Sequence, residues 1–140
     1  MSAKHFLDTN VFVYSFDQSQ PVKRERALAL IANALLTGDG LISTQVIHEF
    51  LNVATRKFAV PLKMEDCKAY LVKVLHPLCQ VYPDLALYET GLDIEQETGY
   101  SFYDSLILAG ALRGGCAILY SEDLQAGQQV RGLQIVNPFV

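Results

Sequence analysis

The sequence is poor in cysteine and has no long hydrophobic run. Its three cysteines, Cys67, Cys79 and Cys116, are odd in number and lack the close pairing of a zinc knuckle or redox motif, which predicts reduced thiols in the core. No stretch approaches the roughly 18 apolar residues that a membrane helix needs. The first residues lack the successive basic, apolar and cleavage regions of a secretion signal. We therefore expect a cytoplasmic protein.

Excess positive charge is missing as well. A net charge of −4 gives no general attraction to nucleic acid, so any RNA contact has to be local. Basic residues gather near 23–26, 56–57 and 63–73, although scattered charges of this kind usually form a solvated helix face. Linkers and repeats are absent, and 140 residues suffice for one core. We expect a single domain over residues 1–140, with part of its apolar surface facing a partner because 51% of the residues are hydrophobic.

Hydrophobic patterning predicts strands that alternate with helices. Short apolar runs predict strands at residues 5–7, 41–43, 78–82, 117–120 and 133–136. Helical spacing, proline starts and glycine stops predict helices from about residue 11 and over 21–36, 44–57, 64–75, 84–98 and 102–112. Such alternation is typical of an α/β sandwich with a mainly parallel sheet.

Four acids stand where such a fold places ligand-binding residues. Asp8 follows the first strand, Asp123 follows the fourth, and Asp104 opens a helix, while Glu49 lies among apolar helix residues. Ligands bind beyond the carboxyl ends of parallel strands. Carboxylates packed together there would repel one another unless a cation held them, and oxygen ligands favour Mg²⁺ or Mn²⁺ over zinc.

Each acid also has a simpler interpretation. Asp8 or Asn10 can be a helix cap, Asp104 stands three residues after Ser101 as in a capping box, and Asp123 after Ser121 can open a helix. Glu49 can lie at the solvated boundary of its helix. Independent caps have no reason to converge at one edge of a sheet, so the combination is the signal.

Four segments in sequence order carry a resemblance to a known family. They are FLDTNV at residues 6–11, STQVIHEF at 43–50, YDSLILA at 103–109 and LYSEDL at 119–124, followed by NPF at 137–139. In these residues the chain resembles the PIN-domain family and, within it, the VapC-like toxin ribonucleases of bacterial toxin–antitoxin pairs. Any one segment is weak evidence, but the four in register span nearly the whole chain.

The resemblance implies that Asp8, Glu49, Asp104 and Asp123 are the catalytic and metal-binding set. It marks Asn10 as a polar contact near the metal, and Ser121 as a residue that orients water or Asp123. The motif match favours Asp123, and Glu122 stays open as an alternative because a one-residue shift of the turn would exchange the two acids.

The family also implies a fold, an activity and partners. The fold is a three-layer α/β/α sandwich around a five-stranded, mainly parallel sheet of order 3-2-1-4-5. The activity is RNA cleavage with Mg²⁺ or Mn²⁺, in which a metal-activated water attacks the phosphodiester and leaves a 5′-phosphate and a 3′-hydroxyl. The partners are RNA, an antitoxin that occupies a groove of the toxin, and a second copy in a homodimer.

Other classes of protein share parts of this pattern. A haloacid dehalogenase-type phosphatase needs a second aspartate where Asn10 stands and a lysine that is missing between residues 106 and 123. A receiver domain needs paired acids near the first strand and a late lysine. A metal-free ribonuclease needs placed histidines, yet His5, His48 and His76 fall in no such motif. An inactive PIN-fold binding module and an RNA-processing nuclease without an antitoxin remain open.

Overall fold

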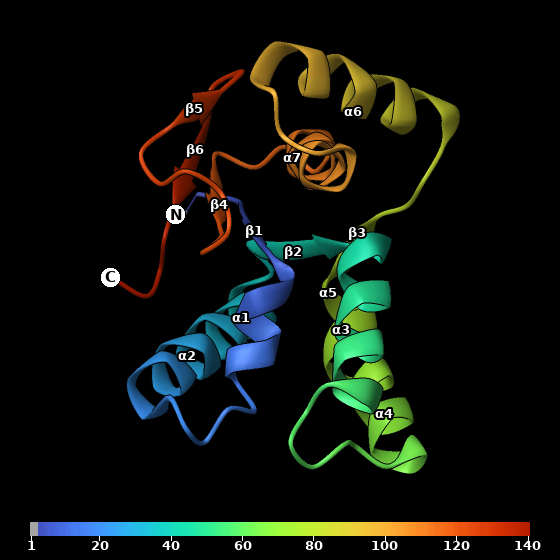
Figure 1. Ribbon diagram of the computed structural model, residues 1–140, viewed down its shortest axis with the longest axis vertical. Coiled ribbons are helices and arrows are strands. Elements are labelled where there is room, and N and C mark those ends of the chain that lie inside the picture. Colours follow the sequence, from blue (N-terminus) through green and yellow to red (C-terminus); the bar gives the residue numbers. More distant parts are fainter. Residues whose placement is uncertain (1–2) are drawn as a thin grey trace.

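A six-stranded sheet forms the centre of the molecule, and β1 lies near its middle (Figure 1). The computed structural model describes residues 3–140. Every neighbouring pair of strands is parallel except β6 and β5, which are antiparallel. The spatial order is β3 (Cys79–Val81), β2 (Gly40–Ser43), β1 (His5–Leu7), β4 (Ile118–Tyr120), β6 (Leu133–Val136) and β5 (Gln129–Val130). The ends of β1, β2 and β4 therefore meet at one edge.

Helices cover both faces of the sheet, which confirms the predicted three-layer sandwich (Figure 1). One face carries α6 (Leu85–Thr98) and α7 (Phe102–Arg113), which pack against each other. The other face carries α1 (Thr9–Tyr14), α2 (Pro21–Thr37), α3 (Thr44–Arg56) and α4 (Met64–Tyr70). None of the helices within residues 3–140 is both long and apolar enough to span a membrane.

The core is apolar, and it includes the cysteines. Its largest fully buried side chains are contributed by the central strands and the helices that cover them, among them Phe6, Phe12, Phe50, Leu41, Leu108, Leu119 and Ile135. Cys67, Cys79 and Cys116 are buried and unpaired, as predicted.

The sheet has one strand more than the five that we expected. The expected parallel order 3-2-1-4-5 is present, with β6 in the fifth place, and β5 adds a short antiparallel strand beyond it. A tight turn at Arg131 and Gly132 joins β5 to β6, and both residues have positive φ angles, 51° and 85°. Primed hairpin turns need this geometry and usually use Asn or Gly. Here the first turn residue is Arg131, and β5 has only two residues, one of them the polar Gln129, so the sequence does not predict a hairpin at this place.

The expected helix over residues 64–75 is longer and less regular than predicted. α4 continues into a π-helical segment, η1 (Leu71–Leu75), and then into α5 (His76–Leu78). Pro77 lacks an amide N–H, and its ring would clash with the carbonyl group four residues earlier in a regular α-helix. The wider turn just before Pro77 is one way in which a helix accommodates such a residue.

Candidate active site

Asp8 is fixed at the carboxyl end of β1. Its backbone N–H donates to the carbonyl of Tyr120 at 3.0 Å, which extends the pairing of β1 with β4. The carboxylate caps α1, because Oδ1 accepts from the Thr9 amide at 2.7 Å, and Oδ2 accepts from Ser121 Oγ at 2.7 Å. The residue is only 6% exposed. Asp8 therefore caps α1 with one carboxylate oxygen and binds Ser121 with the other, so its role as a cap does not exclude a place in a shared site.

Burial gives Asp8 unusual electrostatics. Removal from water raises its pKa from 3.8 to about 7, against the opposing effect of its hydrogen bonds to Ser121 and Thr9. The negative charges of Asp123 and Glu49 contribute to this rise. Both charges thus act on Asp8, and we call Asp8, Glu49 and Asp123 the acidic cluster.

Glu49 reaches the cluster from α3 through Thr9. Thr9 Oγ1 donates to Glu49 Oε1 at 2.6 Å, while the Thr9 amide binds Asp8. Gln45, one helical turn before Glu49, donates to its Oε2 at 3.3 Å. Thr9 thus joins two acids that are 41 residues apart in the chain. Sequence reasoning missed Thr9 and Gln45, although both lie inside the segments that carried the family resemblance.

Asp104 lies in the first turn of α7, where its amide donates to Ser101 Oγ at 3.2 Å. The capping interpretation of Ser101 is therefore confirmed. Asp104 is not among the residues that perturb the Asp8 pKa. Its link to the cluster is indirect, because Gln45 Nε2 donates both to Glu49 and, at 3.0 Å, to the carbonyl of Tyr103. The structure thus links Asp8 to Glu49 through Thr9 and to Asp123 through Ser121, and it places the fourth predicted acid on an adjoining turn.

The turn after β4 separates two neighbouring acids. Ser121 is fully buried, and its Oγ accepts from the Asp123 amide at 3.1 Å while donating to Asp8. Glu122 is bound instead by Tyr14 and Lys23, at 2.5 and 2.7 Å. The hydrogen bonds that Lys23 donates to Glu122 and to Tyr14 raise the pKa of Lys23, so its ammonium stays charged. Between the two candidates left open by the sequence, Asp123 is the one that acts on Asp8.

Comparisons with known proteins identify the family of the chain. The PIN domain family matches residues 5–129, which is most of the chain and includes all four acids. The chain belongs to the PIN domain family. No curated protein sequence matches it significantly.

Solved structures share the fold of this PIN domain. A toxin–antitoxin complex from Klebsiella pneumoniae is 18% identical, with a TM-score of 0.69 over 99% of this chain and 98% of that one. DNA-bound VapBC from Salmonella typhimurium is 22% identical, with a TM-score of 0.64 over 96% and 97%. VapC20 of Mycobacterium tuberculosis, a toxin that cleaves the sarcin-ricin loop, is 16% identical, with a TM-score of 0.57 over 85% and 89%. At these identities the likeness concerns the fold.

The donor set of this PIN domain suits a hard divalent cation. Within residues 3–140, no three His, Cys, Asp or Glu side chains lie close enough together to ligate one ion directly. Mg²⁺ does not need such a cage, since it keeps several waters and binds through one or two carboxylates. A buried carboxylate with a pKa near 7 and two acidic neighbours is a place where a cation would be favourable. The residues present therefore fit Mg²⁺ or Mn²⁺.

The remaining predicted polar residues differ in their surroundings. Asn10, in the first turn of α1, buries both polar atoms of its side chain, and neither has a hydrogen-bond partner among the described residues. His5 is buried at the start of β1, next to the carbonyl of Ala3, whereas His48 and His76 are exposed. Neither His48 nor His76 is among the residues that shift the pKa of Asp8, which agrees with the predicted structural or surface roles.

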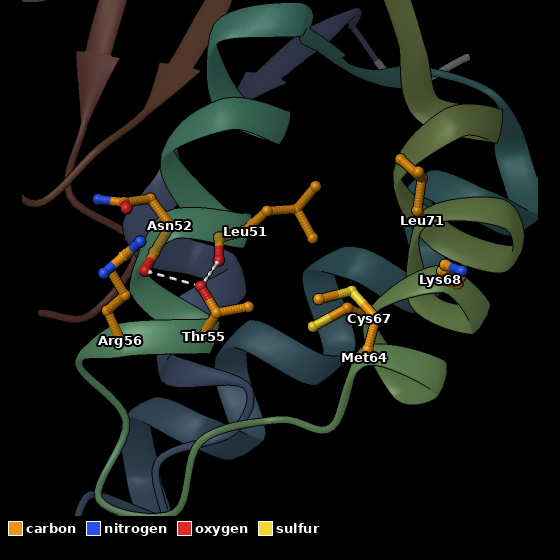
Figure 2. Close-up of a pocket in the computed structure, with 8 residues that line it drawn as sticks. All are labelled: Leu51, Asn52, Thr55, Arg56, Met64, Cys67, Lys68 and Leu71. Carbon is orange, nitrogen blue, oxygen red and sulfur yellow. Dashed lines mark hydrogen bonds between the residues drawn. The ribbon is translucent and has the colours of Figure 1, made fainter.

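Grooves in the helical layer are separate from the acids. One groove, of about 430 Å³, lies between α3 and the segment formed by α4 and η1. Leu51 lies on one side of it, across from Cys67 and Leu71 (Figure 2). Another, of about 410 Å³, lies beside α2 and is lined by Phe16, Leu28, Ile31, Leu35, Tyr70 and Val74 among others. None of the four acids lines either groove. Both grooves are mainly apolar, which suits a protein segment better than a phosphate.

Proposed function

We propose that this PIN domain is a metal-dependent endoribonuclease and the toxin of a toxin–antitoxin pair. The observation that carries the proposal is the shared electrostatic environment of Asp8, Glu49 and Asp123 at the edge where β1 and β4 end. Ligand sites of parallel α/β sheets lie at such an edge. Thr9 holds the carboxylates of Asp8 and Glu49, and Ser121 binds the Asp8 carboxylate and the Asp123 amide, so the carboxylates of Asp8 and Glu49 and the backbone of Asp123 are positioned before any ligand arrives.

In this proposal the set of Asp8, Glu49, Asp104 and Asp123 would hold Mg²⁺ or Mn²⁺, with one or two of the carboxylates binding the ion directly and the others binding its waters. When bound there, such an ion would supply charge that polarises the scissile phosphate and lowers the pKa of a water. The protein supplies fixed carboxylates: Ser121 and Thr9 orient Asp8, and Thr9 and Gln45 orient Glu49. Asn10 offers unpartnered polar atoms as an auxiliary contact. Such supporting hydrogen bonds tune the affinity of the ligands they orient.

The partners proposed are RNA, an antitoxin and a second copy of the chain. Support for the antitoxin comes from similar folds that were solved as toxin–antitoxin complexes. The apolar groove beside α2, with Leu28 and Leu35 each about 40% exposed, offers a surface for an apolar segment of such a partner. Support for RNA as the substrate comes from the similarity to a toxin that cleaves the sarcin-ricin loop.

The test is RNA cleavage by the purified chain, freed of any co-purified partner, with Mg²⁺ or Mn²⁺ and with EDTA. Asp8→Asn removes one acid of the cluster, and Asp66→Asn, at an exposed position on α4, is the matched control. The proposal predicts cleavage that needs metal, disappears in Asp8→Asn and persists in Asp66→Asn. Cleavage that survives both EDTA and Asp8→Asn contradicts it. Binding of Mn²⁺ and RNA without cleavage of any RNA would favour the binding-module alternative.

A further inference from the structure

Glu122 stands beside Asp123 in the chain, yet both of its carboxylate oxygens are engaged outside the acidic cluster. Tyr14 Oη donates to Oε1 at 2.5 Å, and Lys23 Nζ donates to Oε2 at 2.7 Å. Lys23 Nζ also donates to Tyr14 Oη at 3.2 Å. The three side chains close a triangle that connects α1, α2 and the turn after β4.

Aromatic packing supports this triangle. Lys23 Nζ lies 4.7 Å from the centre of the Tyr14 ring and 6.0 Å from that of Phe139, and the two rings are 4.8 Å apart. Arg26 holds the segment that carries Phe139 by donating to the carbonyls of Pro138 and Val140, each at 3.2 Å. The side chains of Lys23 and Glu122 are 31% and 26% exposed, so water screens their ion pair less than it screens a fully exposed pair.

The same turn is held from its other side by the acidic cluster. Ser121 donates to Asp8 and accepts from the Asp123 amide. Three consecutive residues thus have three different environments: Ser121 faces the core, Glu122 faces α1 and α2, and Asp123 acts on Asp8. We propose that Tyr14 and Lys23 form a positioning clamp that holds Glu122 out of the acidic cluster and thereby keeps Asp123 in it.

The physical reason is competition between adjacent carboxylates. Without Lys23, Glu122 would be an uncompensated negative charge one residue from Asp123. Any cation that the cluster attracts would then attract Glu122 as well, and a small shift of the turn would exchange the two acids. A glutamine at position 122 is neutral and does not compete, while its amide oxygen still accepts the Tyr14 hydrogen bond. Lys23 and Tyr14 are therefore positioning residues that need not touch RNA.

The clamp is tested by a rescue experiment with three variants: Lys23→Met, Glu122→Gln and the double variant. Mn²⁺ affinity is measured by electron paramagnetic resonance on the full chain without RNA. Lys23→Met is expected to weaken Mn²⁺ binding about fivefold, the size expected for loss of one partly exposed ion pair. The double variant is expected to return to within about twofold of the wild type, because the two residues are coupled. Lys73→Met, at an exposed position on η1, should change nothing.

A second measurement does not depend on metal. In EDTA, ¹H–¹⁵N spectra report the amides of residues 121–124 directly. Their signals should move in Lys23→Met and return towards their wild-type positions in the double variant, whereas a purely structural loss would leave both variants equally altered. The clamp is contradicted if these signals do not move in Lys23→Met, or if the double variant binds Mn²⁺ as weakly as Lys23→Met does.

This inference rests on the proposed function for its consequences on metal binding and catalysis, but the existence of the clamp does not, so the two fail differently. If the wild-type chain binds no Mn²⁺ and cleaves no RNA, the proposed function fails, and the spectra in EDTA alone decide whether the clamp exists. If the wild type binds Mn²⁺ and cleaves RNA while all three variants behave identically to it, the clamp fails and the proposed function stands.

Discussion

The hydroxyl of Ser121 donates a 2.7 Å hydrogen bond to Oδ2 of Asp8 and so joins the turn after β4 to the end of β1. Both residues are buried, with exposed fractions of 0% and 6%. Replacing Ser121 by alanine leaves Oδ2 without that donor, and should raise the Asp8 pKa above about 7, because this hydrogen bond lowers it. Titration of the Asp8 carboxyl by ¹³C NMR in EDTA measures the effect. An unchanged or lower pKa in Ser121→Ala would contradict the assigned role of the hydroxyl.

The raised pKa of Asp8 also predicts how the stability of the metal-free protein depends on pH. Its folded pKa, about 7, lies above the ordinary value of 3.8, so the folded state binds this proton more tightly than the unfolded state does. The free energy of unfolding should therefore fall as the pH rises from about 4 to 7, with an upper limit of about 4 kcal/mol lost. Urea denaturation of the wild type and Asp8→Asn in EDTA checks this.

Comparing the wild type with Asp8→Asn shows whether the ionised Asp8 carboxylate destabilises the metal-free protein. Asp8→Asn carries no buried charge, so it should lack this part of the pH dependence and be the more stable protein at pH 8. Added Mg²⁺ should stabilise the wild type and not the variant. A wild type that is more stable than Asp8→Asn at pH 8 in EDTA is incompatible with the raised pKa.

Thr9 is predicted to orient Glu49 without forming part of the acidic set. Thr9→Val keeps the amide that binds Asp8 and removes the hydroxyl that donates to Glu49. Cleavage should fall at least about tenfold, as is usual for residues that orient metal ligands. Thr9→Ser retains a hydroxyl and serves as the control. The rate of RNA cleavage at several Mn²⁺ concentrations is the measurement, and equal rates for Thr9→Val and Thr9→Ser would refute the assignment.

Gln45 is predicted to couple Glu49 to the turn that carries Asp104. Its amide donates to Glu49 and to the carbonyl of Tyr103, so Gln45→Leu removes both hydrogen bonds. We expect Mn²⁺ binding to weaken about fivefold, the equivalent of about 1 kcal/mol for one net hydrogen bond. Thermal unfolding in EDTA controls for loss of fold. Unaltered Mn²⁺ affinity in a folded Gln45→Leu protein would show that the link has no function.

The sequence predicted those elements whose signals are local. Caps, prolines and glycines act within a few residues. They predict α2, which begins at Pro21 and is closed by Gly38, and α6, which lies between the caps Asp84 and Gly99. Burial of the strands at residues 5–7 and 133–136 follows from their short apolar runs. β5 was missed because Arg131 is an unusual residue for a turn with positive φ, and the π-helical turn before Pro77 has no distinct hydrophobic period.

In the candidate site too, some residues could be predicted from the sequence and others could not. The four acids could be picked out because each stands in a recognisable segment after a strand or on a helix. Thr9, Gln45, Tyr14 and Lys23 could not, because their roles depend on partners 40 to 108 residues away or on contacts between helices. The choice between Glu122 and Asp123 likewise depends on the direction of a turn, which only the packing of α1 and α2 against it determines.

The central claim is that the acidic cluster hydrolyses RNA with metal-activated water, and the ends of the RNA products test it most directly. The purified chain is incubated with RNA and Mg²⁺ or Mn²⁺, and the new ends are mapped. Attack by water predicts a 5′-phosphate and a 3′-hydroxyl, formed only when metal is present. A 5′-hydroxyl together with a 2′,3′-cyclic phosphate, formed equally well in EDTA, would mean that the RNA 2′-hydroxyl is the nucleophile, and would contradict the claim.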